Sequence, residues 1–379
     1  MKASARTVAL SGLAALAVAM GIGRFAFTPI LPMMQDDAGV TLRQGGWLAS
    51  ANYVGYLLGA LAATRPWVPR VTAIRGGLAL IALATMAMAF ERNLAAWMLL
   101  RALPGFASAW VLVQVSAWTL ERLGQEGRPA LGGVVYAGVG AGIVFTGAAC
   151  LALSSVHAGS AIAWLVLGVS AAVACAWVWP LVGEAQSVQP ARQPRPAAAR
   201  AAQFWPLVLC YGAFGFGYII PATYLPVMAK QVIADPAVFG WAWPVFGAAA
   251  LVSTLAGARL SAALGARRLW VLANLVMALG AVLPAVLDGL GGIVAGALAV
   301  GGTFMVLTMV GMQEARRVGG EGAPALMAAM TSAFAIGQIA GPVLVSGLAR
   351  QPAGMSLALA VAAACLVAAA YTVHAMEEI

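Results

Sequence analysis

Charged residues are scarce in this sequence. Asp, Glu, Lys and Arg make up 9% of the 379 residues, whereas they make up about 25% of an ordinary soluble domain. Hydrophobic residues make up 63% and gather in long apolar runs with short polar intervals between them. This composition excludes a soluble protein and leaves little room for a domain outside a bilayer. Any chemistry must therefore lie in membrane-spanning helices or in their short loops.

Acidic residues are rarer than basic ones, with 12 Asp and Glu against 21 Lys and Arg. None of the acidic residues lies near the middle of an apolar run. The two histidines, His157 and His374, have no metal-ligand spacing, and no Walker-type phosphate loop occurs. We therefore expect no metal, no cofactor, no ATP-driven transport and no enzymatic activity.

Cysteine is also sparse, and its placement is uninformative for chemistry. The four cysteines stand singly in apolar surroundings, without metal or redox spacing, and we expect buried small side chains. The net charge of +9 is spread over many short loops, which does not produce the single basic face that nucleic-acid binding needs. We expect a lipid bilayer and a small molecule as partners, no nucleic acid, and a monomer.

Twelve apolar runs are each long enough to cross a bilayer of about 30 Å. The predicted spans are 8–33, 43–64, 73–90, 94–118, 130–153, 160–182, 204–228, 239–258, 269–287, 290–312, 324–347 and 354–374. With both termini cytoplasmic, the inner segments hold 15 of the 21 Lys and Arg and the outer loops hold four. The positive-inside rule therefore favours cytoplasmic N and C termini.

A polar interval divides the chain into two halves. Residues 184–203 are rich in Pro, Ala and Arg and form the longest non-apolar interval. The sequence thus predicts a six-helix bundle over 1–183, a cytoplasmic linker over 184–203 and a second six-helix bundle over 204–379. Such a linker is typical of a flexible tether.

The two halves are related by a repeat at an offset of 194 residues. The matching pairs are Gly21-Ile22-Gly23 with Gly215-Phe216-Gly217, Leu31-Pro32 with Leu225-Pro226, Met34 with Met228, Gly46-Trp47 with Gly240-Trp241, and Arg65 with Arg259. One register that holds over two helices and two loops predicts a parallel structural repeat. Transporters whose halves rock about a central site have such repeats.

Two segments carry a family resemblance. Residues 21–34 (GIGRFAFTPILPMM) are similar to the helix-1 signature of the YbfB/YjiJ-like branch of the major facilitator superfamily, and residues 101–105 (RALPG) resemble the superfamily's Arg-x-x-x-Gly element on helix 4. The resemblance covers essentially the whole chain. It implies twelve transmembrane helices in two pseudo-symmetric six-helix bundles, alternating access, and a cavity lined mainly by helices 1, 4, 7 and 10.

The sequence departs from the superfamily pattern in two places. The loop between helices 2 and 3 usually contains an Asp after a Gly, but residues 59–65 (GALAATR) contain no acid, and Ser261 stands near that place in the second copy. Residues 337–342 (GQIAGP) on helix 11 resemble a Gly-x-x-x-Gly-Pro element that exporters carry on helix 5. Helix 5 itself has Gly138 and Gly142 without the Pro.

Arg24 and Arg101 are the two charged residues that lie deep inside predicted spans. A charge at that depth costs roughly 2.5 to 3.5 kcal/mol on insertion scales, so buried ionisable groups usually line a polar pathway. Both lie at similar depth and neither has an acidic partner in the sequence pattern. We expect a cationic site for a carboxylate or phosphate, because Arg presents a planar donor fork. The alternative is that each arginine bonds to backbone carbonyls or fixes a helix contact.

Other polar residues could complete such a site. Helix 7 offers three tyrosines, the middle of helix 2 offers an amide and two tyrosines, and helices 4 and 11 each offer a glutamine. The substrate-binding candidates beside the arginines are Tyr211, Tyr218, Tyr224, Asn52, Tyr53, Tyr56, Gln114 and Gln338. Packing of the tyrosines and hydrogen bonding between helices are alternative roles for these residues.

The resemblance and these residues together predict a secondary transporter of a small organic anion in a bacterial cytoplasmic membrane. A proton-coupled multidrug or metabolite exporter is the first alternative, and intramembrane carboxylates would support it. A membrane receptor or intramembrane enzyme is the second alternative, and it would need an extramembrane domain or a catalytic constellation.

Overall fold

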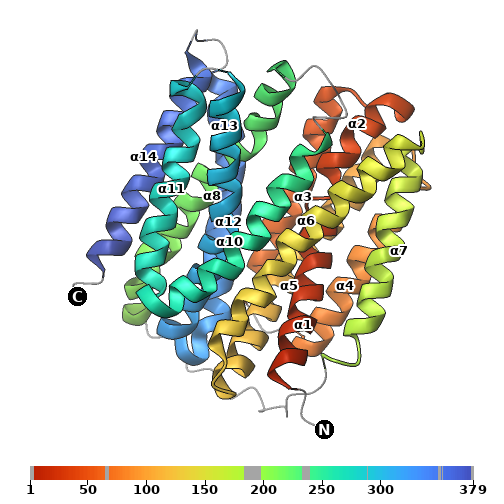
Figure 1. Cartoon of the computed structure of the whole chain (residues 1–379). Coiled ribbons are helices and arrows are strands. Elements are labelled where there is room, and N and C mark those ends of the chain that lie inside the picture. The colour runs from red at the N-terminus through yellow and green to blue at the C-terminus, as the bar shows by residue number, and fades with distance from the viewer. Residues whose placement is uncertain are drawn as a thin grey trace.

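The computed structural model describes residues 4–64, 68–182, 198–232, 240–287, 289–348, 351 and 353–376, and the regular elements in these ranges are helices (Figure 1). The first half contains α1 (Ala5–Leu16), η1 (Ala17–Ile22), α2 (Phe27–Ala38), α3 (Leu42–Ala62), α4 (Arg70–Ala87), α5 (Leu94–Gln125), η2 (Pro129–Leu131), α6 (Gly132–Ser155) and α7 (Ser160–Val178). The second contains α8 (Ala198–Val232), α10 (Ala242–Leu264), α11 (Ala266–Val286), α12 (Leu290–Gly319), η3 (Gly320–Gly322), α13 (Ala323–Leu348) and α14 (Gly354–Ala375).

Ten stretches of the described chain are long and apolar enough to cross a membrane. One of them, Leu290–Val345, contains both α12 and α13. Helix α3 is not among the ten, because Asn52, Tyr53 and Tyr56 make it less apolar. Together with α3, these stretches correspond to the apolar runs expected from the sequence, so the all-helical membrane fold is confirmed.

Several helix boundaries differ from the sequence prediction. The first span is not one continuous helix, because η1 is a π-helical segment and four turn residues separate it from α2. Helix α8 begins at Ala198, inside the predicted linker, and residues 183–197 of that linker lie outside the described residues. Helix α12 continues beyond the apolar run to Gly319, since polar side chains do not by themselves end a helix.

Helix packing follows the sequence repeat. In the first half, α1 and η1 pack on α6, α3 packs on α5, and α4 packs on α7. In the second half, the equivalent pairs are α8 with α13, α10 with α12, and α11 with α14. The halves meet where α6 lies beside α10, as Figure 1 shows, and where α3 packs on α13. The central site therefore lies among helices that belong to two similar bundles.

The α6–α10 contact is a seam of small residues. Gly133, Gly140 and Gly147 follow one another at seven-residue intervals on α6 and face α10. A Cβ built on Gly140 would lie 2.5 Å from the backbone nitrogen of Leu251, and one built on Gly147 would lie 2.7 Å from Pro244. Because no side chain fits there, the two backbones approach closely, as small residues permit in membranes.

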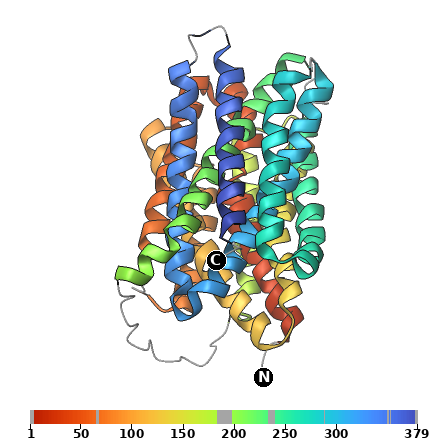
Figure 2. The ribbon, with the colours of Figure 1, turned by 90° about the vertical axis from the view of Figure 1, so that its left-hand side faces the viewer.

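The two chain ends lie toward the same end of the bundle, as Figures 1 and 2 show. The same end carries the α10–α11 junction and the C-terminal end of α12, where basic residues such as Arg267, Arg316 and Arg317 gather. This placement agrees with an even number of membrane crossings.

Candidate functional site

The break in the first span places Arg24 at mid-bundle. Residues 23–26 form turns between η1 and α2, so Arg24 projects from an interrupted helix. A wide π turn of this kind is a common device at functional sites. The sequence explains the interruption locally, because Gly21 lets η1 approach α6 closely and a Cβ at Gly23 would meet the Ala19 carbonyl at 2.7 Å.

Side chains from two neighbouring helices bond to the carbonyls of this break. The Ser108 hydroxyl donates to the Ala19 carbonyl at 2.5 Å. The Asn52 amide nitrogen donates to the Gly23 carbonyl at 3.3 Å, and Arg101 Nη2 donates to the Arg24 carbonyl at 3.3 Å. Helices α3 and α5 therefore stabilise the break, because their side chains supply the hydrogen bonds that these carbonyls would otherwise accept within a continuous helix.

The Arg24 guanidinium lies between the two halves of the protein. Its Nη2 donates to the side-chain carbonyl oxygen of Gln338 on α13, and its Cζ lies 3.9 Å from the ring centroid of Tyr56 on α3. The rings of Tyr53, Phe25 and Phe334 surround it at 5.5, 5.6 and 6.0 Å.

Arg24 is 4% exposed, and its Nη1 is buried with no hydrogen-bond partner among the described residues. Aromatic faces partly compensate a buried cation, but they leave this donor unused.

Arg101 lies behind Arg24, inside the first half. Its Cζ lies 4.7 Å from the ring centroid of Phe27 and 5.9 Å from that of Trp164. It is 3% exposed, and its Nε has no hydrogen-bond partner within the described part of the chain. The Asn52 amide, which bonds to the Gly23 carbonyl, also donates to the Arg101 carbonyl at 2.9 Å. The two arginines thus meet, but only Arg24 faces the second half.

The remaining sequence candidates divide into three groups. Tyr218 is buried on α8 and stacks on Phe334, so it joins the Arg24 surroundings through that ring. Tyr211 lies two turns away on α8, where its ring contacts Phe334 at 5.6 Å on one side and the edge of Trp270 on the other. Gln114 lies on α5 well beyond Arg101. Tyr224 is part of α8, but its side chain lies outside the described residues.

Sequence reasoning missed the aromatic residues around this site. Phe25, Phe334, Phe304, Phe246 and Trp243 lie on four different segments, and their rings contact one another or Arg24. Phe25 directly follows Arg24, which was a usable signal. The other four come from α10, α12 and α13, and no local spacing connects them.

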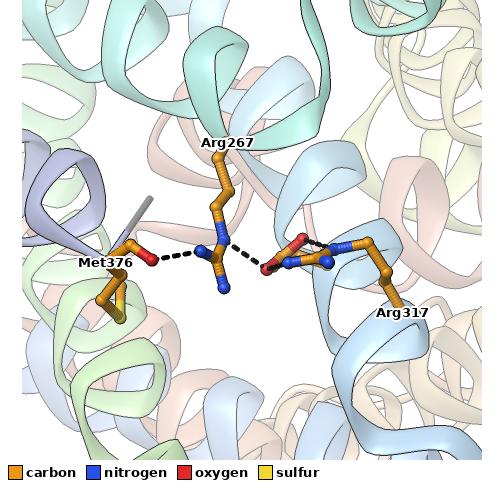
Figure 3. Close-up of polar contacts among 4 residues, drawn as sticks. Arg267, Arg317 and Met376 are labelled. Atoms are coloured by element: carbon orange, nitrogen blue, oxygen red, sulfur yellow. Dashed lines mark hydrogen bonds and ion pairs between the residues drawn. The ribbon is translucent and has the colours of Figure 1, made fainter. Parts of the chain in front are cut away.

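The ion-paired carboxylates of the described residues lie at the basic end of the bundle and not beside Arg24 or Arg101. Glu121 accepts from Arg70 at 3.0 Å in the first half. In the second half, Glu314 accepts from Arg267 at 2.6 Å and from Arg317 at 2.7 Å, as Figure 3 shows. The predicted span 290–312 ends before Glu314, but α12 continues past this residue and leaves it 1% exposed. Each half thus has an acid-base pair at this end, although the Asp of the superfamily pattern is missing.

A cavity of about 640 Å³ opens at this basic end, between the halves. Its polar lining includes Glu121, Gln125, Gln313, Glu314 and Arg317, and Ser261 bonds to Gln313 at 2.9 Å. The described residues contain no group of three His, Cys, Asp or Glu that could hold a metal ion. The cavity is mixed in charge, unlike the Arg24 site.

Comparisons with known proteins agree with this architecture. The crystal structure of the human organic anion transporter MFSD10 (TETRAN) superposes with a TM-score of 0.80, at 15% sequence identity, over 98% of this chain and 100% of the other. At that identity the likeness shows the fold alone. No curated protein sequence matches the chain.

A family description covers nearly the whole chain. The family described as "Uncharacterised MFS-type transporter YbfB" matches residues 16–374. This match agrees with the helix-1 and helix-4 segments that suggested the major facilitator superfamily. The chain is therefore a multi-pass membrane protein of that superfamily and belongs to the YbfB family of transporters.

Proposed function

We propose that this protein transports a small organic anion by alternating access, with Arg24 as the group that binds the anion. The observation that carries the proposal is the position of Arg24 between the halves. Its guanidinium contacts Tyr56 of the first half and Gln338 of the second, and no carboxylate of the described residues pairs with it.

An anion is the partner that this guanidinium lacks. Gln338 supplies a neutral oxygen, and the Nη1 of Arg24 has no partner among the described residues. A carboxylate could accept from both terminal nitrogens of the fork, which is the geometry Arg favours. Because Gln338 belongs to the second half, an anion at Arg24 would also change the contact between the halves. Binding would thereby be coupled to their movement.

The fold and the family are those of transporters, so we propose no enzymatic activity. We place the protein in a bacterial cytoplasmic membrane, as a monomer with both termini in the cytoplasm. The similarity to a structure named as an organic anion transporter is compatible with the proposal, although the proposal depends on Arg24. A proton-coupled exporter of cationic compounds would need a carboxylate near the site, and the described spans place their buried carboxylate, Glu314, at the basic end.

The test is ligand binding by purified protein. A carboxylate that binds only the folded state should raise its melting temperature by mass action. Arg24→Ala should weaken carboxylate binding by roughly tenfold to a hundredfold, as loss of a charge-assisted hydrogen bond of about 1.5 to 3 kcal/mol predicts.

Arg43→Ala is the matched control, because Arg43 also stacks on an aromatic ring, that of Trp47 at 4.9 Å, but lies outside the site. It should bind the carboxylate as the wild type does. Stabilisation by lipophilic cations and not by carboxylates would refute the anion proposal and favour the exporter.

A further inference from the structure

Opposite Arg24, the second half presents a continuous set of aromatic rings. Tyr218 on α8, Trp243 and Phe246 on α10, Phe304 on α12 and Phe334 on α13 form this set, called the ring wall below. Four helices therefore contribute to one surface. Helix formation does not require an aromatic residue at any of these positions, so the clustering of the rings needs a separate explanation.

Successive rings of the ring wall are nearly parallel. Trp243 and Phe246 have centroids 5.4 Å apart and planes 6° apart, and Phe246 and Phe304 follow at 5.3 Å and 18°. Tyr218 stacks on Phe304 at 5.2 Å and 19°, and on Phe334 at 6.2 Å and 23°. These separations are typical of offset stacking. Neighbouring rings of the wall are thus close to parallel, with planes 6° to 23° apart.

The ring wall meets the cation at its Phe334 end and meets the neighbouring Phe25 ring at its Trp243 end. Phe334 lies 6.0 Å from the Arg24 guanidinium carbon. Phe25, which follows Arg24 in the chain, makes edge contacts with Trp243 at 6.1 Å and with Phe304 at 6.2 Å. A ligand group held by Arg24 would therefore lie close to Phe334 of the ring wall and to Phe25.

The sequence repeat shows that the two halves carry different kinds of side chain at equivalent positions of the site. At the offset of 194 residues, Arg24 corresponds to Tyr218 and Asn52 corresponds to Phe246. Where the first half has a cation and an amide, the second half has two members of the ring wall. One side of the site therefore recognises charge, and the other recognises a flat apolar surface.

The rings at the Trp243 end are not sealed into the core. Phe25, Trp243 and Phe246 are half-buried, whereas Phe304 and Tyr218 are buried. The indole N–H of Trp243 is buried without a hydrogen-bond partner among the described residues. That end of the wall therefore combines partly exposed rings with one unused donor.

From these observations we infer that the transported anion is aromatic: an arene with one carboxylate, whose carboxylate binds Arg24 and whose ring stacks on the ring wall. This inference rests on the proposed function and names its substrate class. The guanidinium supplies the charge-assisted contact, and the wall supplies stacking that a saturated ring of the same size cannot match. The unused Trp243 donor suits a hydroxyl or carbonyl substituent on the arene.

The experiment compares three probes on the purified full-length protein. Benzoate has both recognised features, cyclohexanecarboxylate keeps the charge and size without aromaticity, and benzamide keeps the ring without the charge. We expect benzoate to bind roughly threefold to tenfold more tightly than cyclohexanecarboxylate, the range that one aromatic pair supplies. Benzamide should bind far more weakly than either.

Variants locate the preference on the ring wall. Phe304→Leu and Phe246→Leu each keep an apolar side chain and remove one ring face, so each should lower the benzoate preference while cyclohexanecarboxylate binding stays within twofold. Phe145→Leu is the matched control, because Phe145 lies on the outer face of α6 with 44% of its surface exposed. That variant should keep the full preference.

Each outcome separates this inference from the proposed function. Equal binding of benzoate and cyclohexanecarboxylate by the wild type overturns the aromatic substrate while leaving the anion site standing. Failure of both carboxylates to bind overturns the proposed function and this inference together. Benzamide binding as tightly as benzoate overturns the role of Arg24, and an unchanged preference in both Phe variants places the selectivity elsewhere than the ring wall.

Discussion

Arg101 donates a hydrogen bond from Nη2 to the backbone carbonyl of Arg24, at 3.3 Å, while its guanidinium carbon lies 4.7 Å from the ring centroid of Phe27 and 5.9 Å from that of Trp164. The first arginine therefore holds the chain at the point where the second projects toward the other half. The sequence suggested that both could contact a ligand. We therefore propose a positioning role for Arg101 and a binding role for Arg24.

The two arginines should consequently respond differently to substitution. Arg101→Ala leaves the Arg24 carbonyl without its partner, so it should destabilise the protein by about 1 to 3 kcal/mol and lower the transport rate. Arg24→Ala removes an expensive buried charge, so the ligand-free protein should melt at the same temperature or higher. Melting curves with and without carboxylate check both expectations. A loss of stability in Arg24→Ala equal to that in Arg101→Ala would contradict this division of roles.

Much of this architecture could be predicted from sequence because it depends on local patterns. The apolar runs locate the spans, and the 194-residue offset anticipates the paired helix contacts, such as α3 with α5 and α10 with α12. Glycines and prolines surround Arg24 in the sequence, and the break between η1 and α2 occurs there. Each of these features is encoded within one or two helices.

The direction of the deep side chains could not be predicted in this way. The Arg101 side chain points into the first half, where its guanidinium contacts Phe27 of α2 and Trp164 of α7. Both residues are distant from Arg101 in sequence. Gln338 likewise meets Arg24 across the two halves. Which side chain reaches which neighbour depends on the rotation of each helix about its axis, and apolar periodicity is weak where both lipid and core are apolar.

The acid-base contacts at the basic end offer a comparison between the halves. Glu314 is 1% exposed and pairs with Arg267 and Arg317, whereas the Glu121 and Arg70 side chains are 33% and 34% exposed. Glu314→Gln should cost about 2 kcal/mol or more, because two guanidiniums lose a buried carboxylate. Glu121→Gln should cost less than about 1 kcal/mol, as for an exposed pair. Thermal melting of the two variants checks this order, and equal losses would contradict it.

The glycine seam predicts a steric effect between the halves. A Cβ at position 140 would lie 2.5 Å from the Leu251 backbone nitrogen and 2.8 Å from the Gly247 carbonyl, so Gly140→Ala must push α6 and α10 apart. Overpacking of this kind costs about 1 to 3 kcal/mol. Gly76→Ala on α4 is the control, because a Cβ there meets nothing within 4 Å. Melting temperature and transport rate should fall in the first variant, and in the control they should hold or rise.

The charge distribution predicts which loops face the cytoplasm. Cysteines introduced at Ala185 and at Ala158, in a background without the four native cysteines, should differ in reactivity toward membrane-impermeant reagents. Ala185→Cys should react only after the membrane is opened, because it lies on the side rich in Lys and Arg. Ala158→Cys should react in intact cells. The reverse pattern would invert the proposed orientation.

Transport should respond to membrane voltage if the substrate crosses as an anion. The described spans hold no carboxylate beside Arg24 that could carry an obligatory proton, so we expect uniport, anion exchange or a proton carried by the substrate itself. Moving one net charge is worth about 2.3 kcal/mol per 100 mV. In proteoliposomes, an imposed potassium diffusion potential, positive inside, should therefore increase benzoate uptake by a uniporter, and reversing its sign should reduce that uptake.

Exchange of one anion for another would instead be insensitive to voltage but dependent on anion inside the vesicle, so loading the vesicles with benzoate separates the two modes. Co-transport of a proton with the substrate would make uptake follow an imposed pH gradient at zero voltage. All three results are compatible with an anion bound by Arg24, because the protein supplies only the fixed cation. Strict antiport of a cation against protons is not, since a second positive charge beside Arg24 would be repelled at close range in a region of low dielectric constant.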